Sequence, residues 1–211
     1  MGTIKALDGN AAIAYGVMRS KVQLVAAYPI TPQTPIVETI SSLIDTKQYD
    51  ATYITVESEH SALSAVIGAA STGVRTFTAS ASHGLALMHE VTGVTSASRL
   101  PVVMAVVSRA IPGPMCLWCD HSDIMTQRDQ GWIQLFAQSP QEALDMTMIA
   151  YRTSEDARVL IPTMVDIDGF FCSHLTEPVN VPTVEEAERF IQEFKPVNAW
   201  LDTTALTPLT T

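Results

Sequence analysis

Three polar residues in this chain of 211 residues each follow a short β-rich run, and together they offer useful chemistry. They are Thr31, Glu59 and Arg109. Since α/β sheets bind ligands at the carboxyl ends of parallel strands, residues placed in this way are expected at one edge of a sheet. The set supplies a hydroxyl, a carboxylate suited to proton chemistry and a guanidinium suited to binding an anionic group.

Glu59 is the most unusual of the three, because the sequence around it offers little that would solvate a charge. It follows the β-rich run 53–57, and the segment 62–70 after it is small and apolar on every helical face. A helix that is apolar all round is normally buried. Glu59 is therefore either a poorly placed surface acid or an acid kept for proton chemistry.

Thr31 and Arg109 each allow two interpretations. Thr31 stands between Pro29 and Pro32, so its hydroxyl and the free amides of a following helix outline a small anion site. An ordinary Thr-Pro helix cap explains the same residues equally well. Arg109 ends a β-rich run and suits bidentate binding of a carboxylate, although arginines at strand ends are also structural.

The loop 110–123 contains a C-x-x-C pair, Cys116 and Cys119, followed by Asp120 and His121. A structural zinc site needs four ligands, and a second cysteine pair is absent from the sequence. A thioredoxin-like site places its pair at a helix start early in a βαβ unit, which this loop does not. The interpretation of Cys116 and Cys119 as ordinary loop cysteines is therefore favoured over a metal-binding or redox role. Neither a dinucleotide-binding nor a P-loop glycine motif occurs.

The elements that must position these residues alternate along the chain. Strands are expected at residues 23–28, 53–56, 74–79, 101–107 and 158–165, and helices at 10–19, 32–46, 60–72, 84–97, 121–130, 140–154 and 184–194. This order predicts an α/β fold with a mostly parallel sheet and helices on both faces. Asp8 or Asn10 caps the first helix, Thr31-Pro32 starts the second, and Ser139 starts the sixth.

Length and composition limit the class of protein. We expect one α/β domain at residues 1–194, with the Thr-rich segment 195–211 as a linker or the truncated start of a next domain. The formal charge of −10 disfavours nucleic acid or acidic lipid as partners. No membrane span or signal peptide is evident, so the expected compartment is the cytoplasm. Three cysteines argue against a disulfide framework.

Five segments taken together resemble the pyruvate:ferredoxin oxidoreductase family. They are YPITP (28–32), ESEHSA (57–62), ASASHGL (79–85), RAI with DHSDI (109–124) and DGFFCSH (168–174). Each is a weak motif alone, but five in order are specific, and the resemblance covers residues 8–180. It implies a thiamine-diphosphate-binding fold of the pyrimidine type, as the α subunit or N-terminal domain of a 2-oxoacid oxidoreductase.

The resemblance also implies roles for five residues. Glu59 matches the family glutamate that hydrogen-bonds N1′ of the cofactor's aminopyrimidine and so promotes removal of the thiazolium C2 proton. Thr31 and Arg109 match positions that bind the 2-oxoacid carboxylate. Pro29 lies with the cofactor-binding positions, and Leu117 falls where an apolar side chain presses against the cofactor. The Pro112–Pro114 stretch and the cysteine pair depart from the family's loop.

The implied reaction is oxidative decarboxylation of a 2-oxoacid with coenzyme A to acyl-CoA and CO2, with electrons passing to ferredoxin, or the reverse synthase reaction. Pyruvate is the leading substrate, because the segment at Asp168 looks most like the pyruvate branch. Mg²⁺ and the 4Fe-4S clusters are expected in diphosphate-binding and iron–sulfur partner subunits or domains, since three cysteines cannot hold several clusters. The alternatives are a non-catalytic partner-docking scaffold and a C-x-x-C redox or metal module.

Overall fold

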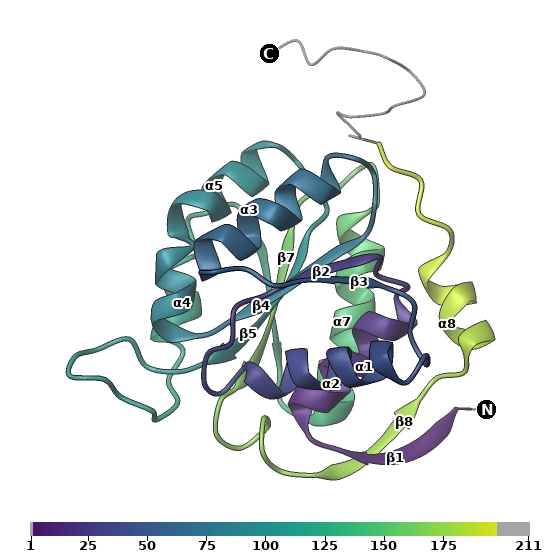
Figure 1. The fold of residues 1–211 in the computed structure, drawn as a ribbon, viewed down its shortest axis with the longest axis horizontal. Coiled ribbons are helices and arrows are strands. Elements are labelled where there is room, and N and C mark those ends of the chain that lie inside the picture. Colours follow the sequence, from purple (N-terminus) through teal and green to yellow (C-terminus); the bar gives the residue numbers. More distant parts are fainter. Residues whose placement is uncertain (1, 198–211) are drawn as a thin grey trace.

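A parallel sheet of six strands forms the centre of the computed structural model, which describes residues 2–197 (Figure 1). Its strands are β2 (Leu24–Ala26), β3 (Thr52–Ile54), β4 (Thr76–Ser80), β5 (Val103–Ser108), β6 (Ile133–Ala137) and β7 (Thr163–Asp168). They lie in the order β3-β2-β4-β5-β7-β6, and every neighbouring pair is parallel. The central strands β4 and β5 are buried along their whole length. The predicted α/β class is confirmed.

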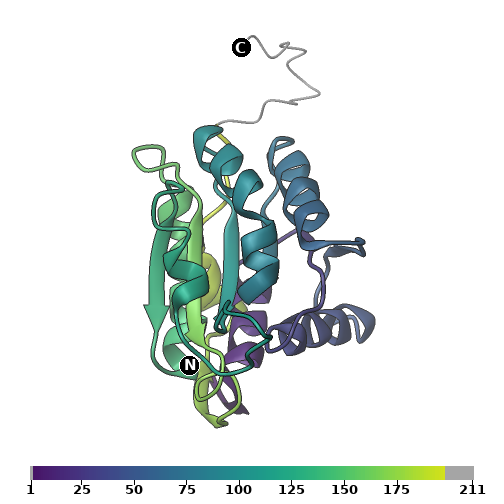
Figure 2. The same cartoon turned by 90° about the vertical axis from the view of Figure 1, so that its left-hand side faces the viewer.

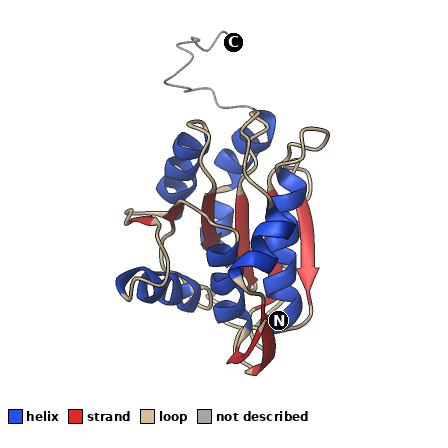
Figure 3. Ribbon diagram, turned by 90° about the vertical axis from the view of Figure 1, so that its right-hand side faces the viewer, coloured by secondary structure: helices blue, strands red, loops and turns tan. Residues whose placement is uncertain are grey.

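Helices cover both faces of the sheet, as the sequence predicts (Figures 2 and 3). One face carries α1 (Gly9–Arg19), α2 (Thr34–Asp45) and α7 (Pro140–Ser154), with α8 (Val184–Ile191) beside them. The other face carries α3 (Glu59–Ala70), α4 (Ser82–Leu87), α5 (His89–Ala97) and α6 (Ser122–Met125). Each face has its own cluster of buried apolar side chains, so the sheet is covered on both sides.

Two of the predicted helix caps are confirmed, and one predicted helix start is wrong. Asp8 caps α1 by accepting a hydrogen bond from the amide of Ala11 at 2.8 Å, and Ser139 caps α7. Helix α2 begins at Thr34 rather than at Pro32. The Ile30 carbonyl accepts the amides of residues 33 and 34, so a turn occupies the predicted first turn of the helix.

Several other predicted boundaries are corrected by turns. The helix expected at 84–97 is two helices, α4 and α5, separated by a turn at the fully buried Met88. The helix expected at 121–130 ends at Met125, because turns lead through Gly131, at φ +75°, into the unpredicted strand β6. The strand expected at 158–165 starts only at Thr163, since Leu160 adopts a left-handed conformation.

Two more strands were not expected from the sequence. Strands β1 (Thr3–Leu7) and β8 (Glu177–Val181) form an antiparallel pair, seen side by side in Figure 1. The pair joins the N-terminal segment to the strand that precedes α8, and such a long-range partner leaves no local sequence signal. Of the predicted linker, only residues 195–197 are described, and 198–211 lie outside the described residues. Within residues 2–197, none of the helices combines the length and apolar character needed to cross a bilayer.

Candidate active site at the carboxyl edge of the sheet

The structure places the three predicted polar residues at the carboxyl edge of the sheet. Arg109 directly follows β5, Glu59 opens α3 after β3, and Thr31 lies in the turn between β2 and α2. Arg109 is 5% exposed and donates a hydrogen bond from Nη1 to the Thr31 carbonyl oxygen at 2.6 Å. The contact therefore uses the Thr31 backbone, while the residue itself is exposed. The buried Nε of Arg109 has no partner among the described residues.

Glu59 is 8% exposed and is the first residue of α3, whose start is capped by Ser58. The positive end of the helix dipole favours a carboxylate at this place. Within the described part of the chain, no hydrogen bond or ion pair of the Glu59 carboxylate is found. The nearby Ser80 Oγ is fully buried and also has no partner there. Since buried polar groups are normally satisfied, these atoms are available to hydrogen-bond a ligand.

Gly84, near the start of α4, makes room for the Glu59 carboxylate. A Cβ atom added at Gly84 would lie 2.5 Å from Glu59 Oε1 and 2.6 Å from Ser80 Oγ, which is far too close for either. The glycine therefore allows the close approach of α4 to the Glu59 side chain. Helix α3 is not buried on every face as its apolar sequence predicts, because Ser64 and Gly68 are exposed.

We expect Gly84→Ala to displace the Glu59 carboxylate and to lower activity in the complete enzyme by about 10- to 100-fold, since a 1 Å misplacement alone can cost that much. Gly68→Ala is the matched control, because a Cβ there meets nothing within 4 Å. Steady-state rates of the 2-oxoacid oxidation that the family resemblance implies check the result. Equal activity of the two variants would show that the packing against Gly84 does not matter.

The two remaining predicted cofactor contacts lie in exposed segments. Pro29 is exposed in the turn after β2. Leu117 is 55% exposed on the loop 110–121, which projects from the body in Figure 1. The base of this loop is closed by a hydrogen bond from the Ala110 amide to the Trp118 carbonyl at 3.0 Å, and the Trp118 ring lies 5.2 Å from that of Phe170. The roles of Pro29 and Leu117 stay predictions.

The cysteine pair has no feature of a redox or metal site. Cys116 and Cys119 are both free and partly exposed. Burial, followed by a hydrogen bond with Asp168, raises the pKa of the Cys119 thiol to about 12, so it carries little of the reactive thiolate. Among residues 2–197, no three His, Cys, Asp or Glu side chains are grouped to bind a metal ion. The redox or metal hypothesis therefore lacks a supporting observation.

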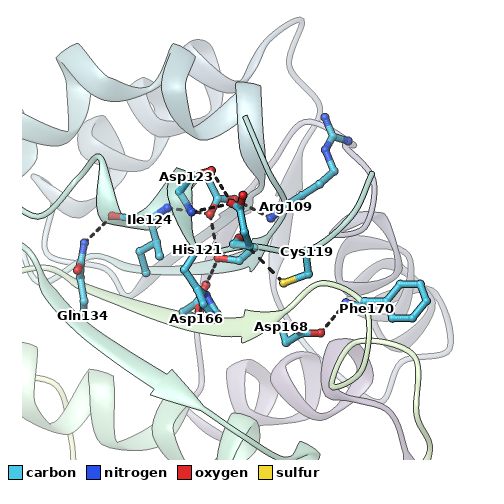
Figure 4. A network of polar contacts seen from close by, with 12 residues as sticks. Arg109, Cys119, His121, Asp123, Ile124, Gln134, Asp166, Asp168 and Phe170 are labelled. Atoms are coloured by element: carbon cyan, nitrogen blue, oxygen red, sulfur yellow. Dashed lines mark hydrogen bonds and ion pairs between the residues drawn. The ribbon is translucent and has the colours of Figure 1, made fainter. Parts of the chain in front are cut away.

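Asp123 is a buried acid beside these residues that the sequence placed only within a motif. It is fully buried at the start of α6 (Figure 4). Its Oδ2 accepts the backbone amides of Ser82 at 2.8 Å and Arg109 at 2.9 Å, while its Oδ1 accepts the Ile124 amide and the Ser108 hydroxyl. Asp123 thereby joins the backbone at the end of β4 to the backbone that carries Arg109.

Asp166 was not predicted at all. It is 1% exposed inside β7, where it contacts the Ser108 hydroxyl and lies 2.9 Å from Nδ1 of His121. Burial raises its pKa to about 8, the charges of Asp123 and Asp168 act in the same direction, and the Ser108 hydroxyl opposes them. An acid inside an apolar strand such as Thr163–Asp168 is the sequence signal that could have revealed it.

The raised pKa of Asp166 makes the stability of the fold dependent on pH. The folded chain keeps this proton up to about pH 8, whereas the unfolded chain loses it near its ordinary pKa of 3.8, so stability falls as pH rises between those values. In the unaltered chain this should lower the free energy of unfolding by roughly 3 to 4 kcal/mol between pH 5 and pH 8, and we expect Asp166→Asn to abolish that decrease. Urea unfolding of the purified subunit at both pH values measures it, with the exposed Asp129→Asn as control. Identical pH slopes for Asp166→Asn and the unaltered subunit would contradict the expectation.

A cavity of about 570 Å³ lies at the opposite, amino edge of the sheet and does not coincide with these groups. Its lining includes Lys21 and Arg75. Arg75 is already paired with Glu155 through two hydrogen bonds of 2.6 and 2.8 Å, and Lys21 with Glu188. These two basic side chains are therefore paired within the fold, and the candidate site remains at the carboxyl edge.

The fold and the site define a parallel α/β domain that presents a buried carboxylate and a buried arginine for a ligand at its carboxyl edge. Residues 15–209 match the family model described as "Pyruvate flavodoxin/ferredoxin oxidoreductase, thiamine diP-bdg", that is, thiamine diphosphate-binding. The chain belongs to this family, as its five motifs indicate.

Curated relatives agree with this membership. The chain is 48% identical over 198 residues to pyruvate synthase subunit PorA of Pyrococcus furiosus and 49% identical over 198 residues to that of Thermotoga maritima. It is 46% identical over 198 residues to ketoisovalerate oxidoreductase subunit VorA of Pyrococcus horikoshii. Each alignment covers 94% of this chain and 50% of the relative. The chain thus spans about half the length of the curated relatives it matches.

A solved structure supports the fold. The 2-oxoglutarate:ferredoxin oxidoreductase from Magnetococcus marinus, determined with 2-oxoglutarate, coenzyme A and succinyl-CoA bound, superimposes with a TM-score of 0.76. The match covers 87% of this chain and 32% of that one, at 23% sequence identity. At this identity the likeness concerns the architecture alone.

Proposed function

We propose that this chain supplies the pyrimidine-binding side of a thiamine diphosphate site in a coenzyme A-dependent 2-oxoacid:ferredoxin oxidoreductase. The single observation that carries the proposal is the buried Glu59 carboxylate, which has no partner within residues 2–197 and lies at the same sheet edge as Arg109. The names of the relatives, pyruvate synthase and ketoisovalerate oxidoreductase subunits, support the reaction class. The enzyme would oxidise a 2-oxoacid to acyl-CoA and CO2, or run in reverse.

Each residue has a defined task in this proposal. Bound thiamine diphosphate supplies a carbon nucleophile for the 2-oxo group. The Glu59 carboxyl hydrogen-bonds a ring nitrogen of the aminopyrimidine and holds the proton that this nitrogen needs. Arg109, already oriented by its bond to the Thr31 carbonyl, binds the carboxylate of the 2-oxoacid, with the exposed Thr31 hydroxyl beside it. Burial of Glu59 and Arg109 excludes water and strengthens both interactions.

Partner subunits or domains complete the proposed enzyme. The sequence has no phosphate-binding glycine motif, so the cofactor's diphosphate and its Mg²⁺ would be bound by a partner. The iron–sulfur clusters and ferredoxin would receive the electrons, and coenzyme A would take the acyl group. A cytoplasmic location stays a prediction from the sequence.

The choice among 2-oxoacids is tested by assaying the complete enzyme with pyruvate, 2-oxoglutarate and 2-oxoisovalerate, each with coenzyme A and ferredoxin. We expect kcat/KM for pyruvate to exceed that for the other two by at least about 10-fold, since a pocket shaped for one apolar side chain discriminates by that factor or more. A preference for 2-oxoisovalerate would correct the substrate but keep the function. Absence of any coenzyme A-dependent oxidation would favour the non-catalytic docking scaffold instead.

A further inference from the structure

We propose that Asp123 is a positioning residue for Arg109, and that Ser108, Asp166 and His121 form a hydrogen-bonded chain that stores one proton and keeps Asp123 in its anionic form. These four residues are called the Asp123 network below (Figure 4). The inference rests on the proposed function, because it concerns how Arg109 is presented to the 2-oxoacid.

Asp123 fixes two backbone segments of the site at once. A single oxygen, Oδ2, accepts the amides of Ser82 and Arg109, which belong to neighbouring strand ends. Ser82 has φ +46°, a left-handed conformation that is uncommon for a residue with a side chain and needs support from its surroundings. Gly84, which contacts Glu59, lies two residues later in the same helix. Asp123 therefore ties the Glu59 side of the site to the Arg109 side.

Hydrogen-bond counting shows that the Asp123 network holds an extra proton. The Ser108 hydroxyl has one hydrogen, yet its Oγ lies within hydrogen-bonding distance of Oδ1 of both Asp123 and Asp166. If both acids were ionised, one of these contacts would place lone pair against lone pair. Asp123 accepts two backbone amides at Oδ2, and one amide and the Ser108 hydroxyl at Oδ1, so all four of its lone pairs are used and none is left for a proton. The proton is therefore on Asp166, which donates to Ser108, and Ser108 donates to Asp123.

The surroundings of Asp166 agree with this assignment. The groups that face it are His121 and Ser108, the acids Asp123 and Asp168, and the thiols Cys119 and Cys172. His121 alone among these can carry a positive charge. Its Nδ1–H donates to Asp166 Oδ2, and its ring packs edge-on against Phe136. Since His121 is 47% exposed, it connects the buried proton to solvent.

A rise in pH should therefore weaken the hydrogen bond between the Asp123 carboxylate and the Arg109 amide. Burial raises the pKa of Asp166 to about 8, so above that pH two carboxylates compete for one hydroxyl hydrogen. Repulsion between them would pull Asp123 from its amides and disturb the Arg109 backbone. The Asp166→Asn side chain reproduces the neutral acid, because its amide nitrogen can donate to Ser108 and its oxygen can accept from His121.

The test compares Asp166→Asn, Asp123→Asn and the exposed control Asp129→Asn in the complete enzyme between pH 6.5 and 9.5. We expect kcat/KM for the 2-oxoacid to fall above about pH 8 in the unaltered enzyme and in the control. In Asp166→Asn the ratio of kcat/KM at pH 9 to that at pH 7 should be at least about fivefold higher, because the titrating group is gone. Asp123→Asn should lose about 10- to 150-fold in kcat/KM, mainly through KM for the 2-oxoacid, because a hydrogen bond to a charged group is broken.

A second readout does not depend on activity. The infrared carbonyl stretch of a protonated carboxyl group should be present at pH 7 and absent in Asp166→Asn. An unchanged spectrum in that variant, or an alkaline limb identical to that of the unaltered enzyme, would overturn the inference. So would Asp123→Asn activity within threefold of the unaltered enzyme; if that variant fails to assemble, Asp166→Asn decides alone. An unaltered enzyme that oxidises no 2-oxoacid would instead refute the proposed function. The infrared measurement would then still test whether Asp166 carries the proton.

Discussion

Replacing Glu59 with Gln is expected to lower 2-oxoacid oxidation by the complete enzyme about 10²- to 10⁴-fold while subunit assembly stays intact. The amide keeps the size of the side chain but cannot hold or release the proton that the aminopyrimidine nitrogen requires. The carboxylate is buried and has no partner in the described part of the chain, so its removal breaks no internal hydrogen bond or ion pair. Size-exclusion chromatography and steady-state rates measure assembly and activity together.

Glu57→Gln is the matched control for this change. Glu57 is exposed, lies two residues earlier and accepts a hydrogen bond from the Ser61 hydroxyl at 2.6 Å. We expect the control to keep nearly all activity, since a surface substitution away from the site changes little. If Glu59→Gln were as active as Glu57→Gln, the carboxylate would have no role in catalysis.

Arg109→Lys is the second change with a large expected effect. Lysine keeps the positive charge but cannot present two parallel N–H groups to a carboxylate, nor reach the Thr31 carbonyl in the same way. We expect kcat/KM for the 2-oxoacid to fall by about 30- to 1000-fold, with KM rising and the affinity for thiamine diphosphate nearly unchanged. Initial rates over a range of 2-oxoacid concentrations, together with cofactor titration, separate the two effects.

The exposed Arg128 provides the control for Arg109. Its guanidinium is 62% exposed, lies 3.7 Å from the Asp129 carboxylate and donates a hydrogen bond to the Met125 carbonyl at 3.2 Å. Arg128→Lys should leave both kinetic constants within about twofold, because exposed ion pairs contribute little. A KM for the 2-oxoacid that is unchanged in Arg109→Lys would remove Arg109 from the substrate site.

Local patterns were sufficient for most of the fold. The core strands β4 and β5 are runs of buried residues, and the caps at Asp8 and Ser139 are short-range signals, so both were predictable from sequence. The pairing of β1 with β8 was not, because it joins residues 170 to 178 positions apart. The turn at Met88 was also hidden, since the residues on either side of it form good helices.

The candidate site was predictable only in part for the same reason. Glu59 and Arg109 follow strands, and that position, together with the apolar segment after Glu59, identified them. The environment of Asp166 depends on Ser108, which lies 58 residues away at the end of β5, and on Asp123 in α6. Only the folded chain brings these groups within hydrogen-bonding distance, so no local pattern could show that they share a proton.

The exchange rate of the C2 proton of bound thiamine diphosphate tests the central claim most directly. Hydrogen–deuterium exchange, quenched and read by NMR, is measured in the complete enzyme with and without Glu59→Gln. The account predicts that exchange slows by at least about 100-fold in the variant while the cofactor remains bound. Equal exchange rates with equal cofactor occupancy would contradict it, because Glu59 would then take no part in activating the cofactor.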